Sequence, residues 1–162
     1  MSLVFAHRGA SGHAPENTLE AFRLAMEMGA DGFELDVHVT KDGELVVIHD
    51  EAVNRTTNGK GLVKDMTLAE LKELDACKGM EAYRGAKIPT LAEVYELVKD
   101  TNHIVNVEIK TDNYFYPQIE EKCLALTREM GMEDRVIYSS FNHYSLVKLH
   151  ELNPDAKLGM LS

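Results

Sequence analysis

The sequence lacks the features that mark membrane and secreted proteins. No apolar run approaches the roughly 18 residues that a membrane-spanning helix needs. The N-terminal stretch MSLVFAHRGA has no charged region followed by an apolar segment and a cleavage site, so we expect no secretory signal and a cytoplasmic location. Basic residues are also scarce, 17 against 27 acidic ones, and the net charge of −10 argues against a nucleic acid or an anionic membrane as a partner.

Cysteine is scarce, and internal repeats and low-complexity tracts are absent. Cys77 and Cys123 lie 46 residues apart in segments with helix-like patterns. We expect two free thiols, and a disulfide is the less favoured alternative. The 162 residues, 44% of them hydrophobic, suit a single domain with its own core.

The hydrophobic pattern alternates between strands and amphipathic helices. We expect strands over residues 3–7, 33–39, 44–48, 103–109, 135–139 and 156–161. We expect helices that start at Asn17, Thr67 and Thr90 through capping boxes, and two more over 117–130 and 142–152. Gly29 should end the first helix. The turn sequence at 41–43 makes the second and third strands a hairpin.

Strands that alternate with helices of about 10 to 15 residues are typical of βαβ units and a parallel sheet. An open doubly wound sheet and part of a (β/α)₈ barrel both fit this pattern. No G-x-G-x-x-G follows the first strand, which disfavours the nucleotide-binding version of the doubly wound fold. Residues 51–89 interrupt the alternation, and we interpret them as an insertion whose short helix packs through Leu68, Leu71 and Leu74.

The strand FELDVHV, residues 33–39, raises a question about burial. Its alternation places apolar residues on one face and three polar residues on the other, namely Glu34, Asp36 and His38. Buried carboxylates are costly unless they are paired, hydrogen-bonded or bound to a metal, and a solvated acidic face is the simpler alternative. The later strand VNVEIKT repeats the pattern, with Glu108 and Lys110 on one face.

Polar residues also follow the other strands of the expected sheet. His7 and Arg8 end the first strand, and His49 and Asp50 end the hairpin. Because the carboxyl ends of parallel strands build active sites in such folds, we expect these groups to gather there with the carboxylates. Their number argues against a purely solvated surface.

The gathered groups point to phosphoryl transfer. The carboxylates Glu34, Asp36 and Glu108 suit a hard divalent cation such as Mg²⁺ or Ca²⁺, which take oxygen ligands. Zinc stays possible through the histidines. Two histidines can act as general acid and base near neutral pH. Arg8 and Lys110, together with a metal, would form a positive cradle for a phosphate.

A set of motifs in the chain resembles the glycerophosphodiester phosphodiesterase family. They are HRG at 7–9, PENT at 15–18, GADGFELDV at 29–37, DGELVVIHD at 42–50, NRTT at 54–57 and VEIK at 107–110. The resemblance covers nearly the whole chain. It implies a TIM-barrel type fold in which 51–89 is the small insertion of the family, and it implies hydrolysis of glycerophosphodiesters to sn-glycerol 3-phosphate and an alcohol.

The resemblance also implies roles for individual residues. His7 and His49 are then the catalytic acid and base, and Arg8 and Lys110 contact the substrate phosphate. Glu34, Asp36 and Glu108 hold one divalent cation, Mg²⁺ or Ca²⁺. A cyclic phosphate, made by attack of a glycerol hydroxyl on phosphorus, is the step that the family resemblance suggests.

The chain departs from this family pattern in length. A TIM barrel takes about 250 residues and eight strands, whereas the pattern here supplies five or so βα strands. We therefore expect an open sheet whose edges expose apolar residues of the first and last strands. A fragment, a natural truncation or a second chain over the edge would each explain this, and we favour self-association or a missing C-terminal segment. A catalytically silent relic that binds phosphate or a partner is the alternative function.

Overall fold

Five parallel strands form the centre of the fold, and the computed structural model describes all 162 residues. The parallel strands, in their order across the sheet, are β1 (Phe5–His7), β2 (Gly32–Val39), β4 (Ile104–Ile109), β5 (Val136–Ser140) and β6 (Lys157–Met160). A sixth strand, β3 (Leu45–Val47), pairs antiparallel with the end of β2 and completes the expected hairpin. The order is that of consecutive strands in a (β/α) barrel, and it ends after the fifth parallel strand.

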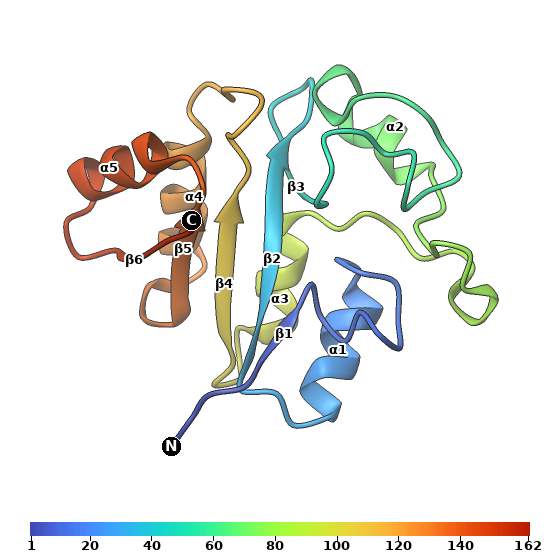
Figure 1. Cartoon of the computed structure of the whole chain (residues 1–162), viewed down its shortest axis with the longest axis horizontal. Coiled ribbons are helices and arrows are strands. Elements are labelled where there is room, and N and C mark those ends of the chain that lie inside the picture. Colours follow the sequence, from blue (N-terminus) through green and yellow to red (C-terminus); the bar gives the residue numbers. More distant parts are fainter.

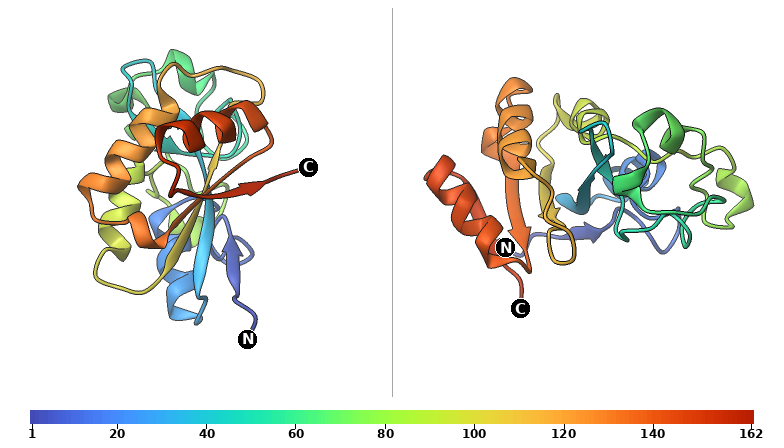
Figure 2. Two further views of the ribbon diagram at one scale, coloured as in Figure 1. Left: turned by 90° about the vertical axis from the view of Figure 1, so that its left-hand side faces the viewer. Right: turned by 90° about the horizontal axis from the view of Figure 1, so that it is seen from above.

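The helices lie on the outside of this curved sheet. They are α1 (Leu19–Glu27), α2 (Leu68–Lys72), α3 (Leu91–Val98), α4 (Ile119–Glu129) and α5 (His143–Leu152), with single 3-10 turns at 63–65, 81–83 and 133–135. Helices α1, α3 and α4 cover one face of the sheet, while both chain ends lie on the other side (Figures 1 and 2). The fold is thus the first part of a TIM-barrel type fold.

The apolar face of β2 is buried in the main core of the protein. Phe33, Leu35 and Val37 are fully buried and pack with helix residues such as Phe22 and Leu91. Each such side chain contributes on the order of 1.5–3 kcal/mol when it leaves water. The helices therefore hold the apolar face of β2, which leaves its polar face directed toward the inner side of the sheet.

Residues 51–89 pack around a smaller core of their own. Leu71 of α2 is fully buried there with Val53 and Val63, and the cluster includes Val46 and Ile48 from beside β3. Leu68 and Leu74 are partly buried against this cluster, which we name the insertion core. In Figure 1 this segment lies beside β3, at the end of the sheet toward which β2 and β4 point.

The helix starts are confirmed at two positions and wrong at a third. Thr67 and Thr90 form complete capping boxes with Glu70 and Glu93. The first helix is capped by Thr18, whose hydroxyl accepts from the Ala21 amide, and not by Asn17. Asn17 has a left-handed φ of 55°, and its side-chain amide donates a hydrogen bond to Asp36 instead of capping the helix.

Other boundaries differ by one or two residues from the expectations. The first strand begins at Phe5 rather than at residue 3, and the fourth helix begins at Ile119 because Gln118 before it adopts a φ of 65°. Cys77 lies in irregular structure and not in a helix, while Cys123 lies in α4. Both cysteines are unpaired, as the sequence predicts.

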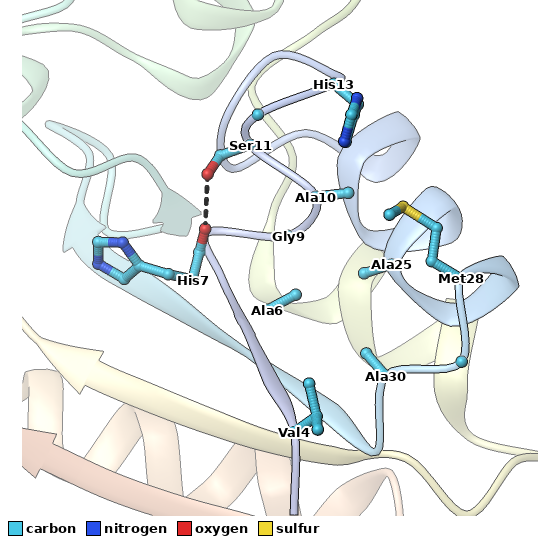
Figure 3. A pocket seen from close by; sticks show the side chains of 12 residues that line it. Val4, Ala6, His7, Gly9, Ala10, Ser11, His13, Ala25, Met28 and Ala30 are labelled. Atoms are coloured by element: carbon cyan, nitrogen blue, oxygen red, sulfur yellow. Dashed lines mark hydrogen bonds between the residues drawn. The ribbon is translucent and has the colours of Figure 1, made fainter.

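The two edges of the sheet are open. Leu3 and Val4 beside β1 are 56% and 60% exposed, and Met160 in β6 is 73% exposed. A groove of about 500 Å³ runs between β1 and α1, and half of its twelve lining residues are hydrophobic (Figure 3). Val4 and Met28 line it together with small residues and the two histidines His7 and His13. The expected exposure of apolar edge residues is confirmed. None of the helices combines the length and the hydropathy that crossing a membrane would require.

Candidate functional site

The candidate site lies where the parallel strands end. A cavity of about 350 Å³ is lined there by nine residues, namely His7, Arg8, Glu34, His49, Asn106, Glu108, Ser139, Phe141 and Leu161. It contains five of the seven residues that the sequence singles out. The other two, Asp36 and Lys110, are buried next to it, since Asp36 pairs with Glu108 across β2 and β4 and Lys110 lies 3.4 Å from the Glu108 carboxylate.

Three carboxylates form the floor of this site. One oxygen from each of Glu34, Asp36 and Glu108 lies within 4.8 Å of the others. Parallel pairing brings Asp36 directly opposite Glu108, while Glu34 lies two residues earlier on the same face of β2. Burial raises the pKa of both Glu34 and Asp36, and the neighbouring carboxylates raise them further.

The donor set fits a hard divalent cation. Glu34 Oε1 and Asp36 Oδ1 are buried and have no hydrogen-bond partner in the protein, which is unusual for carboxylate oxygens. A cation with oxygen ligands would satisfy both atoms and would offset the repulsion among the three carboxylates. The cluster contains no histidine and no cysteine, so it fits Mg²⁺ or Ca²⁺ better than zinc.

Two cationic side chains flank the carboxylates. Arg8 Nε lies 3.6 Å from Asp36 Oδ2, and this nitrogen is buried without a hydrogen-bond partner. Lys110 Nζ lies 3.4 Å from Glu108 Oε1 and 3.5 Å from Asp112 Oδ2. Both cationic side chains thus lie beside the carboxylates. An anion bound next to the carboxylate cluster would be attracted by Arg8 and Lys110.

The backbone at Arg8 is held in an unusual conformation. Arg8 has a φ of 58°, and its amide donates to the Glu34 carbonyl at 3.0 Å and to Glu34 Oε2 at 3.2 Å. The Arg8 carbonyl accepts from the amide of Asn17, the second residue with a left-handed φ. Such strain persists only where surrounding bonds hold it, and it is common at functional sites.

The two histidines line the same cavity but have different surroundings. His7 Nε2 lies 3.7 Å from Glu34 Oε2, and the His7 side chain is 69% exposed. Partial burial and the nearby Arg8 charge lower the pKa of His7. His49 is less exposed, and its Nδ1 lies 2.8 Å from Asp50 Oδ1. Because the ionised carboxylate only accepts, His49 donates through Nδ1 and its Nε2 is free for a substrate.

Asn17 is a site residue that the sequence reasoning missed. Its Nδ2 donates to Asp36 Oδ2 at 3.0 Å, and the Asn17 side chain is buried. The amide therefore holds Asp36 while leaving its other oxygen toward the cluster. One signal was available, because Asn17 and Thr18 are consecutive candidate caps for one helix and only one of them can fill that position.

His38 is a second missed residue. It lies on the same face of β2 as Glu34 and Asp36, but it is fully buried, with its ring nitrogens 2.7 Å from Tyr116 Oη and 2.9 Å from the His49 carbonyl oxygen. Burial lowers the pKa of His38. In the neutral ring, Nε2–H donates a hydrogen bond to the His49 carbonyl and Nδ1 accepts one from the Tyr116 hydroxyl. His38 therefore supports the backbone of His49 and does not reach the cavity.

Comparison with known proteins identifies relatives of this chain. A sequence model of the Glycerophosphoryl diester phosphodiesterase family matches residues 7–162. A glycerophosphodiester phosphodiesterase of Caldanaerobacter subterraneus subsp. tengcongensis is 57% identical over 161 residues, which are 99% of this chain and 66% of that protein. The chain therefore spans just under two thirds of the length of this relative.

Solved structures give the same result for the fold. The crystal structure of glycerophosphodiester phosphodiesterase from Agrobacterium tumefaciens superimposes with a TM-score of 0.89 at 38% identity, over 98% of this chain and 66% of that one. An Oleispira antarctica phosphodiesterase in complex with the product sn-glycerol-3-phosphate superimposes with a TM-score of 0.83 at 38% identity, over 99% of this chain and 66% of that one.

Proposed function

The chain belongs to the glycerophosphoryl diester phosphodiesterase family, and on this premise we propose that it hydrolyses glycerophosphodiesters to sn-glycerol 3-phosphate and an alcohol. One observation carries the proposal. Three carboxylates, two of them buried and one partly buried, lie within 4.8 Å of one another at the strand ends, beside a cavity that two histidines and an arginine line. The product bound to the Oleispira antarctica relative supports sn-glycerol 3-phosphate as the product here.

We assign phosphate binding to the cations around the carboxylates. A Mg²⁺ or Ca²⁺ ion held by Glu34, Asp36 and Glu108 would supply positive charge to the phosphate oxygens. Arg8 and Lys110 add donors beside that position, and their contacts with Asp36 and Glu108 hold them there before substrate binds. Preorganised positive charge of this kind stabilises the extra negative charge of the transition state.

We assign proton transfer to the histidines. In the first step His49 Nε2 accepts the proton of the glycerol 2-hydroxyl as that oxygen attacks phosphorus, and the Asp50 carboxylate at Nδ1 stabilises the resulting imidazolium. The bond from phosphorus to the alcohol oxygen breaks, and His7 donates its proton to that oxygen, which leaves a cyclic phosphate. In the second step His7 accepts a proton from water as it attacks phosphorus. His49 then returns its proton to the 2-oxygen.

The segment 51–89 and the cellular location complete the proposal. We place residues 51–89 as an inserted unit of a single domain that shapes access to the site, because its core packs against the end of β3 next to His49. The two unpaired cysteines support a reducing compartment, and we propose the cytoplasm.

A catalytically silent protein that binds phosphate or a partner is the second candidate. The exposed edges at β1 and β6 favour it, because catalytic groups must be held to within about 0.5 Å and an open sheet constrains them less. On the first proposal, self-association or further polypeptide covers these edges.

The test is a coupled assay for glycerol 3-phosphate release from glycerophosphocholine, glycerophosphoethanolamine and glycerophosphoglycerol, with and without EDTA. We expect release from at least one substrate, loss of release with EDTA, and recovery with excess Mg²⁺ or Ca²⁺. Release that EDTA does not affect would contradict the metal assignment. Phosphate binding without any release would favour the silent alternative.

A further inference from the structure

Glu16 is a buried carboxylate that the proposed reaction does not use. It lies in the loop between β1 and α1, and its side chain is only 6% exposed. Three cations surround it: Arg55 Nη1 and Nη2 at 3.0 and 2.7 Å, Lys78 Nζ at 2.9 Å, and Arg8 Nη1 at 3.3 Å. Burial alone would raise the pKa of Glu16, but the hydrogen bonds from Arg55 and Lys78 lower it to about 2.

Arg55 joins this carboxylate to the proposed general base. The guanidinium that binds Glu16 also donates from Nε to Asp50 Oδ2 at 2.9 Å and from Nη2 to Asp50 Oδ1 at 3.0 Å. Asp50 Oδ1 in turn accepts from His49 Nδ1 at 2.8 Å. A continuous series of charge-assisted contacts therefore runs from Glu16 through Arg55 and Asp50 to His49.

The planar guanidinium is the part that makes this connection possible. Its five donors have a fixed geometry, so a guanidinium that bridges two carboxylates restrains their relative position. A lysine ammonium at the same place could bind one carboxylate, but it would not set the orientation of the other. Lys78 illustrates the difference, because it contacts the same Glu16 and reaches no oxygen of Asp50.

The connection spans distant parts of the chain. Arg55 and Glu16 are 39 residues apart, and Lys78 and Glu16 are 62 residues apart. Two cations from residues 51–89 thus dock this segment onto the loop that also carries Asn17. The docking places Arg55 against Asp50, which directly follows His49.

We infer that Arg55, held by Glu16, is a positioning residue that fixes the Asp50 carboxylate and thereby the Nδ1–H tautomer of His49. Its effect on turnover rests on the proposed function, whereas its effect on the tautomer does not. Without the bridge, Asp50 keeps only the His49 contact and can rotate. The His49 ring then loses its fixed orientation, and its Nε2 is not reliably free to accept a proton.

The test combines side-chain NMR with kinetics on the full chain. In ¹⁵N-histidine-labelled protein we expect long-range ¹H–¹⁵N spectra to show His49 in the Nδ1–H tautomer, and Arg55→Gln to show a mixture of tautomers. His150 in α5, which is outside this series of contacts, serves as an internal control, because its signals should not change. In the coupled assay we expect kcat to fall by about 10–100-fold with KM within about 2-fold, because Arg55 acts through Asp50 on His49 and does not contact the substrate.

Lys78→Met is the matched control, since it removes a cation of the same sign from the same carboxylate. It should leave the His49 tautomer and kcat unchanged. If Arg55→Gln does not fold, Arg55→Lys replaces it and should show the same mixture of tautomers, because a lysine cannot bridge both carboxylates.

Each outcome decides between the alternatives. An unchanged His49 tautomer in folded Arg55→Gln, or equal changes in Lys78→Met, would overturn the inference. If the wild-type chain releases no glycerol 3-phosphate but Arg55→Gln still alters the His49 tautomer, the inference about Arg55 holds and the proposed function fails.

Discussion

Two parts of the sheet differ in how their apolar residues are covered, namely the covered end beside β3 and the open edges at β1 and β6. Beside β3, the insertion core buries Leu71, Val53 and Val63 completely. At one open edge, β6 exposes Met160, and Val147 of the neighbouring α5 is 55% exposed. All of the proposed site residues come from β1, β2, β4 or the residues that follow β1, β3 and β4, and none comes from β6 (Figure 1). The comparison teaches that the proposed catalytic groups lie beside the well-packed part of the fold and apart from the exposed strand β6.

The polar network at the covered end reaches the proposed general base. Glu16, Asp50 and Arg55 form hydrogen bonds that join three segments of the chain and end at His49. The network on the side of β6, in which Ser145 bonds Thr111 and Glu120, joins α4 and α5 and does not reach His49. Networks of this kind hold side chains in single positions. The predictions that follow test whether function depends on the covered end and association on the open edges.

The largest expected effect concerns the general base at the covered end. His49→Ala should lower kcat by about 10²–10⁴-fold, because the proton of the attacking hydroxyl then has no acceptor. Metal binding should not change, since His49 is outside the carboxylate cluster. The coupled assay and calorimetry on one preparation give both quantities. A normal kcat would return His49 to a structural role.

Association through the open edges at β1 and β6 is the next effect. The chain exposes Leu3 and Val4 at one sheet edge and Met160 at the other, and exposed apolar edge strands favour association with another chain. Sedimentation equilibrium at micromolar concentration should therefore show dimers or larger species. Leu3→Lys with Met160→Lys should shift the distribution toward monomer. A cooperatively unfolding monomer at all concentrations would contradict this reading of the edges.

A pair of alanine substitutions compares how much the covered end and an open edge contribute to the free energy of unfolding. Leu71→Ala in the insertion core should lower the free energy of unfolding by about 2–5 kcal/mol, because it leaves a cavity. Met160→Ala at the open edge should change it by less than about 0.5 kcal/mol. Urea denaturation measures both variants. Substrate preference should stay the same in Leu71→Ala, and a changed preference without loss of stability would show that Leu71 contacts substrate.

A smaller effect is expected from pH. The folded-state pKa of Glu16 is about 2, below its ordinary value of 4.5, so its contribution to stability is complete above pH 4.5 and is lost as the pH falls toward 2. Wild type should therefore be more stable than Glu16→Gln at pH 7, and the difference should shrink below pH 4.5. Urea denaturation at several pH values tests this. Glu81→Gln, at a side chain that is 78% exposed, should show no such trend.

Much of the fold and of the candidate site could be predicted from local pattern. Alternation in β2 is a local property, so it places Glu34 and Asp36 on the face opposite Phe33, as the structure confirms. The pairing of Asp36 with Glu108 depends on the register between strands far apart in sequence, and no local signal specifies it. The expectation that parallel strands gather their polar residues at one edge grouped Glu108 with the other two carboxylates, and the family resemblance implied the same ligand set.

Asn17 and Glu16 have partners that depend on the three-dimensional arrangement of the chain. Asn17 reads as a helix cap because its residue type and the Glu20 after it fit a capping box, but the bond to Asp36 competes for its side chain and Thr18 supplies the cap. The contacts of Glu16 with Arg55 and Lys78 join segments that become neighbours only after residues 51–89 fold back. Sequence reasoning without a three-dimensional arrangement therefore finds charged residues in these positions but not their partners.

The three-carboxylate cation site is the central claim, and isothermal titration of Mg²⁺ and Ca²⁺ tests it most directly. Wild type should bind one cation per chain, and Glu108→Gln should bind it at least about 10–100-fold more weakly. Loss of a residue that only hydrogen-bonds to a metal ligand already lowers metal affinity by this factor, and loss of the ligand itself should lower it at least as much. Glu120→Gln is the matched control, because Glu120 is also buried but contacts Ser145 and Lys148 and lies outside the carboxylate cluster. The Glu120→Gln variant should bind the cation with the affinity of wild type. An affinity of Glu108→Gln equal to that of wild type would contradict the account.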